Sequence, residues 1–191
     1  MRELNIPFLR TRESRILFLL FILTLSIRLA FISQKNLWFY EIYSWHLSRQ
    51  SFLSIIFTTW SDIHPPLFYF MLKGWIWVLG DSVTALRILP VLCCSLSIFF
   101  IYPISRRILN VQNTFLVIIL YALSPLNLFY SQEVRMAAVN LFFNLGSSYY
   151  LIKIIETSRS NSQNEVQNNI LLKYRRYYIL FAVLSLYTHY F

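Results

Sequence analysis

Residues 86–105 read LRILPVLCCSLSIFFIYPIS, an apolar run that is interrupted by one charged side chain. A transmembrane α-helix needs about 20 consecutive, mostly apolar residues. Four further runs approach that length, the last of them still apolar where the sequence stops: Ile16–Ser33, Phe115–Tyr130, Ala137–Ile155 and Tyr177–Phe191. We therefore predict an all-α, polytopic transmembrane protein with about five spanning helices, joined by interfacial or re-entrant helices.

The composition excludes an ordinary water-soluble domain. Apolar residues make up 57% of the chain and charged residues only 13%, whereas a soluble domain carries roughly 25% charged residues. The net charge of +9 does not indicate nucleic acid, because the basic residues flank apolar runs, as the positive-inside rule requires. We expect an integral, multi-pass protein of the plasma or inner membrane, surrounded by membrane lipids, with residues 1–15 as a cytoplasmic N-terminus.

The stretch Leu67–Gly80 decides the topology. It is short and contains Lys73 and Gly74, and apolar stretches of about 10–14 residues are typical of re-entrant or interfacial segments. If this stretch does not cross the membrane, the clusters of basic residues that follow it in the sequence lie in the cytoplasm, on the same side as the N-terminus. Residues 34–84 are then the first outer loop and 156–173 a cytoplasmic linker. Residues 131–136 and 188–191 face the same outer side as that loop.

Polar side chains with possible chemistry fall in these outer segments. Glu41 lies among aromatic residues in LWFYEIYSW (37–45), where it is either a solvated charge in an aromatic belt or a desolvated carboxylate suited to general-base work. His64 follows Asp62 and is fixed by Pro65 and Pro66, because a double proline sets the chain direction.

The second outer segment reads YSQEVRM (130–136) and contains Glu133 and Arg135. A guanidinium there would suit a phosphate, which it can bind in bidentate fashion. Arg28, near the outer end of the first run, could do the same or could extend to the membrane surface. His189 lies in the polar cluster that ends the last run. Three clusters distant in sequence are thus expected on one side of the membrane.

The chain resembles the N-terminal part of the GT-C glycosyltransferases related to dolichyl-phosphate-mannose–protein mannosyltransferases, especially their bacterial branch. The matching pieces, in order, are LWFxExYS (37–44), HPPLFY (64–69), GDS with ALRILP (80–90), SP (124–125), YSQExRM (130–136) and YTHYF (187–191). The resemblance implies a GT-C-like transmembrane domain over 16–191. Family members are longer, so we expect this chain to be a truncated form.

The resemblance also implies a chemistry. Members transfer a sugar from a polyprenyl-phosphate carrier to a lipid, glycan or protein acceptor on the outer face. Their first outer loop carries an Asp-Glu pair whose Asp is the general base. The Asp position is Tyr40 here, and a tyrosine hydroxyl, protonated at neutral pH, is a poor base. Either Glu41 takes over or catalysis is impaired. His64 and Arg135 would contact the carrier phosphate or the acceptor, and Gln132 and Glu133 belong to the site in general.

Two functions remain from the sequence. The first is a membrane glycosyltransferase that uses a lipid-phosphate sugar donor, without a cofactor or a metal. The second is a truncated or degenerate, non-catalytic membrane protein that at most binds a lipid-linked sugar. A transporter is a weaker third reading, because charged pairs are missing from the middle of the apolar runs, where translocation sites are expected.

Overall fold

The computed structural model describes residues 12–30, 32–62, 64–159 and 165–190. Every regular element in these ranges is a helix. In chain order they are α1 (Arg12–Leu29), α2 (Phe39–Arg49), α3 (Phe52–Trp60), α4 (Leu67–Leu79), α5 (Val83–Leu96), α6 (Ile98–Ser105), α7 (Val111–Leu123), α8 (Pro125–Ser131), α9 (Met136–Ser158) and α10 (Glu165–Thr188). The predicted all-α class is confirmed.

Short polar residues set several helix starts. The side-chain oxygens of Ser51, Ser82 and Asn110 each accept a hydrogen bond from the backbone N–H three residues later, at 3.2, 3.2 and 2.8 Å. Each satisfies a donor that the first helical turn leaves unpaired. Gly80 ends α4 with a φ of 80°, a conformation that side chains with a Cβ rarely adopt.

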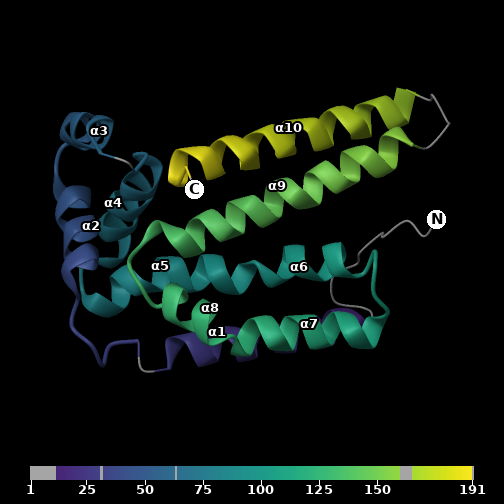
Figure 1. Cartoon of the computed structure of the whole chain (residues 1–191), viewed down its shortest axis with the longest axis horizontal. Coiled ribbons are helices and arrows are strands. Elements are labelled where there is room, and N and C mark those ends of the chain that lie inside the picture. The colour runs from purple at the N-terminus through teal and green to yellow at the C-terminus, as the bar shows by residue number, and fades with distance from the viewer. Residues whose placement is uncertain (1–11, 31, 63, 160–164, 191) are drawn as a thin grey trace.

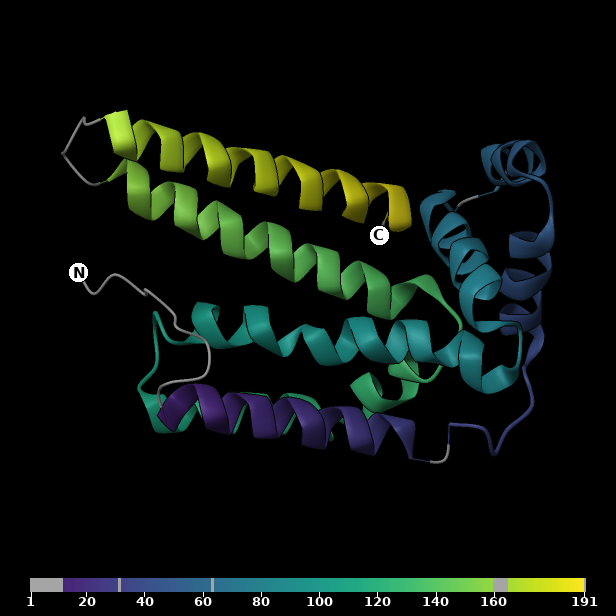
Figure 2. The same ribbon diagram turned by 180° about the vertical axis from the view of Figure 1, so that it is seen from behind.

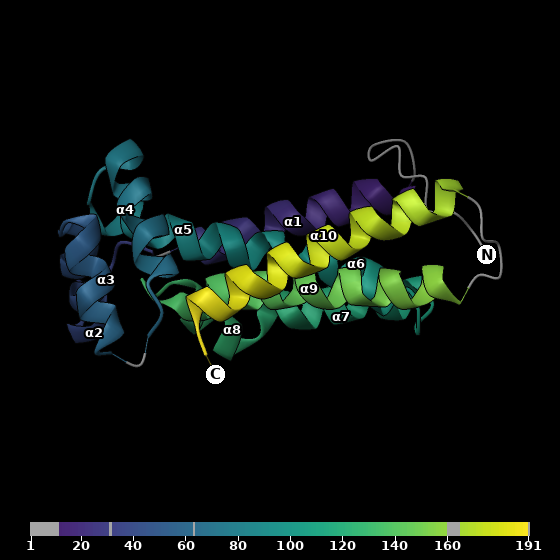
Figure 3. The same ribbon diagram turned by 90° about the horizontal axis from the view of Figure 1, so that it is seen from above.

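The long helices α1, α5–α6, α7, α9 and α10 run along the long axis of the molecule, and α2, α3 and α4 gather at one end of it (Figure 1). The view from behind and the view from above show the same arrangement (Figures 2 and 3). The α8–α9 turn and the C-terminal end of α10 lie at that same end (Figure 1). The three segments expected to share one face, 34–84, 131–136 and 188–190, are therefore together at what we call the α2–α4 end.

The opposite end of the bundle carries ion pairs between elements distant in sequence. Arg107, after α6, pairs with Glu156 near the end of α9 at 2.5 Å, and Arg106 lies 3.8 Å from Glu13 in the first turn of α1. These are basic residues that the sequence analysis assigned to the cytoplasmic side. Residues 1–11 of the expected cytoplasmic N-terminus lie outside the described residues.

The expected number of spanning helices is not confirmed. Among the described residues, one helical stretch is long and apolar enough to cross a membrane, Val83–Ser105, which joins α5 and α6 and has a mean hydropathy of 2.1. The helices α7 and α8 qualify only as a pair, and that pair bends by 55°. Charged side chains disqualify α1, which includes Arg12, Glu13, Arg15 and Arg28. Polar uncharged residues, such as Asn140 and Asn144, lower the hydropathy of α9.

The expected linker 156–173 also differs from the structure. Helix α9 continues to Ser158, and α10 begins at Glu165, well before the apolar run that starts at Tyr177. Residues 160–164 of the linker lie outside the described residues. The polar sequence is helical because α9 and α10 pack against each other along their length, and tertiary packing overrides weak local propensity.

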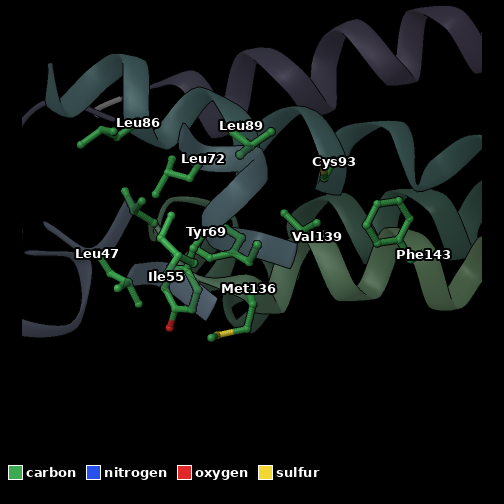
Figure 4. Close-up of a cluster of buried hydrophobic side chains, with 12 residues drawn as sticks. Leu47, Ile55, Tyr69, Leu72, Leu86, Leu89, Cys93, Met136, Val139 and Phe143 are labelled. Atoms are coloured by element: carbon green, nitrogen blue, oxygen red, sulfur yellow. The ribbon is translucent and has the colours of Figure 1, made fainter. Parts of the chain in front are cut away.

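The main hydrophobic core lies where the α2–α4 end meets the long helices. Buried side chains from α2, α3, α4, α5 and α9 meet there (Figure 4), among them Leu47, Ile55, Leu72, Leu86 and Val139. Each of these five is at most 1% exposed. This packing fixes α2 and the turn before α4 relative to α9, and those are the segments that carry the predicted site residues.

Candidate functional site

A buried ion pair organises the α2–α4 end. Arg87 on α5 donates from Nε to Glu41 Oε1 at 2.9 Å and from Nη2 to Glu41 Oε2 at 2.7 Å. The backbone N–H groups of Val134 and Trp38 donate to the same carboxylate at 3.0 and 3.2 Å. Glu41 is 0% exposed and Arg87 6% exposed. A bidentate guanidinium–carboxylate pair is among the strongest polar contacts in proteins.

This arrangement bears directly on the base role expected for Glu41. Four donated hydrogen bonds occupy its carboxylate, and the group has no surface from which to reach an acceptor. The geometry of Glu41 therefore fits a positioning role.

Two cavities flank the ion pair. The first, which we call the His64 cavity, has a volume of about 500 Å³ and is lined by Phe39, Tyr40, Tyr43, Ser44, Thr58, Ser61, Asp62, His64, Tyr69, Arg135 and Met136. The second, the Glu133 cavity, measures about 460 Å³ and is lined by Gln34, Lys35, Asn36, Trp38, Glu41, Arg87, Phe129, Gln132 and Glu133. Both volumes fall in the range of ligand sites, roughly 300–1,000 Å³.

The His64 cavity brings together residues from three separate segments. Tyr40 and Tyr43 lie three positions apart on α2, so they share one face of that helix. The guanidinium carbon of Arg135, at the start of α9, lies 4.6 Å from the centre of the Tyr40 ring, and cations bind aromatic faces in this way. His189, beyond α10, is not among the residues that line this cavity, but its ring lies 5.4 Å from that of His64. The cavity therefore joins sequence-predicted residues with cationic and aromatic character.

His64 is held neutral in this cavity. Burial lowers the pKa of His64 below its usual value; His189 and Arg135 act in the same direction, and Asp62 opposes them. The Nδ1 atom is buried without a hydrogen-bond partner among the described residues. A neutral imidazole donates from one ring nitrogen and accepts at the other. His64 therefore offers a ligand a hydrogen bond, and the positive charge in the cavity comes from Arg135.

Glu133 occupies the other cavity. It is 6% exposed, and its Oε2 atom has no hydrogen-bond partner among the described residues. Burial raises the pKa of Glu133, and the nearby Glu41 raises it further, whereas Arg135 and Arg87 act against the rise. Its location separates it from His64, although the sequence analysis placed both in one site.

The side chains of Gln132 and Arg28 donate hydrogen bonds to backbone carbonyl groups. The Gln132 amide donates to the carbonyl oxygens of Arg28 and Ala30 at 2.8 and 3.0 Å, at the end of α1. The Arg28 guanidinium is fully buried and donates to the carbonyls of Tyr121 and Ala122 at 3.5 and 3.4 Å. The last carbonyls of α7 have no helical donors because the helix ends at Leu123, and Arg28 supplies donors to two of them. Arg28 is thus buried within the protein, and it is not among the residues that line the His64 cavity.

Two residues of the site were missed by the sequence analysis. Arg87 belongs to the ALRILP motif and Asp62 precedes His64 by two positions, but neither was predicted to be a site residue. The signal for Arg87 was a single charge in an otherwise apolar run, because a buried charge requires a partner of opposite sign. Asp62 lines the His64 cavity and accepts a hydrogen bond from the Tyr43 hydroxyl at 2.9 Å; a pattern of residue types does not reveal such a pair.

Within the described ranges, no group of three or more His, Cys, Asp or Glu side chains is placed to hold a metal ion. A search of curated proteins and a search of solved structures each returned no match. The family model for dolichyl-phosphate-mannose-protein mannosyltransferase matches residues 63–164. That match covers just over half of the chain, from the turn that carries His64 through Arg135 and the whole of α9. The chain belongs to the dolichyl-phosphate-mannose-protein mannosyltransferase family.

Proposed function

We propose that this protein is a membrane glycosyltransferase that moves a sugar from a polyprenyl-phosphate carrier to an acceptor hydroxyl at the outer face of the membrane. Membership of the family supports a glycosyltransferase. The observation that carries the proposal is the His64 cavity, where a guanidinium, a neutral imidazole and a carboxylate line one space of about 500 Å³.

The cavity supports recognition of a phosphate. Arg135 caps the start of α9, and the N-terminus of a helix presents unpaired N–H groups that favour an anion. The guanidinium of Arg135 offers the bidentate geometry that a phosphate accepts, and its stacking on Tyr40 limits the positions that it can take. His64 adds one neutral hydrogen bond.

The groups that line the cavity suit the following reaction. The acceptor oxygen attacks the anomeric carbon of the sugar as the bond from that carbon to the phosphate oxygen breaks. The phosphate leaves with the bonding electron pair, and the charge that develops on it is stabilised by Arg135 and by the hydrogen bond from His64. Preorganised donors aimed at a developing charge provide a large share of catalysis.

We propose that Glu41 acts at a distance from this chemistry, as a positioning residue. Its carboxylate fixes the backbone N–H of Val134 and the side chain of Arg87, and Arg135 follows Val134 directly. We further propose that residues 16–191 form a GT-C-like domain, with 34–84 as its first outer loop and the long helices across the membrane.

A second candidate is a non-catalytic protein that only binds a lipid-linked sugar. The observation that favours it is Tyr40, which stands where the family places its base and which is packed against Arg135. Binding without transfer would identify this second function.

The test is transfer by purified protein in detergent. Dolichyl phosphate mannose with a tritiated sugar is incubated with wild-type protein and with membranes of the source cells as acceptor, and undecaprenyl phosphate mannose is tested in parallel. We expect release of the polyprenyl phosphate and labelling of a membrane component. Wild-type protein that binds a donor without releasing its phosphate would support the second candidate.

A further inference from the structure

The proposed transfer needs a group that takes the proton of the acceptor hydroxyl. Tyr40 has no carboxylate, and four donors occupy the carboxylate of Glu41. Of the described residues that line the His64 cavity, Asp62 is the one with a carboxylic acid side chain. It comes from the turn between α3 and α4, not from the α2 segment where the family carries its base.

The Asp62 carboxylate is held in a defined position. Tyr43 donates its hydroxyl proton to Asp62 Oδ2 at 2.9 Å. Burial raises the pKa of Tyr43 to about 12, and the hydrogen bond to Asp62 contributes to the rise. Tyr43 therefore stays protonated and keeps its donor role throughout the physiological range. The Tyr43 ring itself packs edge-on against Tyr69 at 6.3 Å between centroids, which fixes the donor.

The same turn brings the carboxylate next to the phosphate-recognition groups. Asp62 and His64 are two positions apart, and the double proline at 65–66 fixes the chain that follows them. Arg135 lines the same cavity from α9. A base that serves the proposed reaction must lie beside the acceptor while the cation lies beside the leaving phosphate, and a cavity with both groups on its wall meets that requirement.

We propose that Asp62 is the general base of the transfer reaction, an assignment that rests on the proposed function. The acceptor O–H bond breaks and its proton goes to the Asp62 carboxylate. The acceptor oxygen forms the bond to the anomeric carbon, and the bond from that carbon to the phosphate oxygen breaks with its electron pair retained by the phosphate. No oxidant or further reactant is needed. Tyr43 is a positioning residue for the base.

The first experiment compares Asp62→Asn with Asp81→Asn, using dolichyl phosphate mannose as the donor. Asp81 lies at the surface, where it pairs with Arg49 at 3.4 Å, so it is a matched control. General-base catalysis contributes roughly 10²–10⁴-fold. We expect Asp62→Asn to lower kcat by about that factor while donor binding and the melting temperature stay near the wild-type values, and Asp81→Asn to keep kcat.

Two further variants separate catalysis from structure. Tyr43→Phe removes the hydrogen bond that holds the Asp62 carboxylate in place. We expect it to lower kcat by less than Asp62→Asn does and to leave KM for the donor near the wild-type value. In the Asp62→Asn background, Tyr40→Asp returns an acid to the position where the resemblance places the family base, and we expect it to recover part of kcat.

The outcomes separate the two proposals. If wild-type protein releases no polyprenyl phosphate from either donor, the proposed function fails and this assignment fails with it. If wild-type protein is active and folded Asp62→Asn keeps wild-type kcat, only the assignment of the base is overturned. A folded Tyr43→Phe variant with wild-type kcat would also count against it.

Discussion

Glu41 and Arg87 lie 46 positions apart in the chain, yet they form a bidentate ion pair with N–O distances of 2.9 and 2.7 Å, buried where α2 meets α5. Removal of one partner from such a pair leaves an uncompensated charge, which typically costs about 3–5 kcal/mol. We expect Arg87→Met to lower the free energy of unfolding in detergent by about that amount.

Two controls give that experiment its meaning. Arg49→Met breaks the Arg49–Asp81 pair, whose side chains are 56% and 47% exposed, and we expect a cost of about 1 kcal/mol or less. The double variant Glu41→Gln with Arg87→Met removes both charges and should recover much of the stability. Equal stabilities for Arg87→Met and Arg49→Met would show that the buried pair does not hold the fold together.

Substitution of Arg135 is predicted to affect activity, whereas substitution of Arg28 is predicted to affect stability. Arg135 lines the His64 cavity, so Arg135→Ala should lower kcat/KM for dolichyl phosphate mannose by roughly 10²–10³, the usual effect of losing one group that stabilises developing charge. Among the described residues, the Arg28 guanidinium donates to backbone carbonyls, so Arg28→Ala should lower the melting temperature and leave KM unchanged. A raised KM in folded Arg28→Ala protein would return Arg28 to the substrate site.

The titration of Glu133 predicts a pH dependence of stability. Its pKa is raised by burial, so the folded state holds this proton more tightly than the unfolded state does. The stabilising contribution is complete below the unfolded value and is lost as pH rises through the folded pKa. Glu133→Gln should therefore be more stable relative to wild type at pH 7 than at pH 4.

Glu156 is predicted to give a pH dependence of stability that is opposite in sign to that of Glu133. The hydrogen bond from Arg107 lowers the pKa of Glu156, so its contribution is present above the unfolded value and lost as pH falls. Glu156→Gln should reduce stability at pH 7 and have less effect at pH 4. Thermal unfolding of wild type and both variants across this pH range measures the two effects, and slopes of the same sign in both variants would contradict the assignment.

Gly146 is predicted to be required for the packing of α9 against α10. A Cβ atom built at this position would collide with the ring of Phe181, and the ring cannot move freely because Phe100, Phe142, Phe143 and Tyr150 surround it. Overpacking typically costs about 1–3 kcal/mol. We expect Gly146→Val to lower the melting temperature clearly, whereas Gly74→Val, where a Cβ has open space, should change it little. Recovery by Phe181→Ala in the Gly146→Val background would confirm the contact.

The sequence predicts part of this architecture well. Apolar runs and their flanking charges are local properties, so the helical class and the gathering of 34–84, 131–136 and 188–190 at one end followed from them. The number of membrane-spanning helices did not follow from them. Polar residues within the helices, such as Arg28, interrupt the apolar runs, and their partners are known only from the folded structure. The same limit explains α10, whose polar first half is helical through its contact with α9.

The sequence indicated where several residues of the candidate site lie better than it indicated which role each residue has. His64, Arg135 and Tyr40, from motifs that are distant in sequence, line one cavity, and their part in a substrate site stays a prediction. Glu41 and Glu133 have the residue type of a base, but their roles depend on which groups face them, and Arg87 and the surrounding burial decide that. Asp62 was noted only as a neighbour of His64 in the sequence, and the hydrogen bond from Tyr43 indicates the orientation of its carboxylate.

One backbone N–H group links α2 to the start of α9, the two segments that carry Tyr40 and Arg135. The Val134 N–H, bound to Glu41 at 3.0 Å, tethers the start of α9 to α2, and the Arg135 side chain projects from the next residue. The adjacent positions 40 and 41 therefore control different properties. In the proposed reaction, a change at Tyr40 alters the chemical groups offered to the acceptor, whereas a change at Glu41 alters the place from which the guanidinium reaches the phosphate. Substitutions at these two neighbouring positions are therefore expected to give different defects, one in chemistry and one in the geometry of binding.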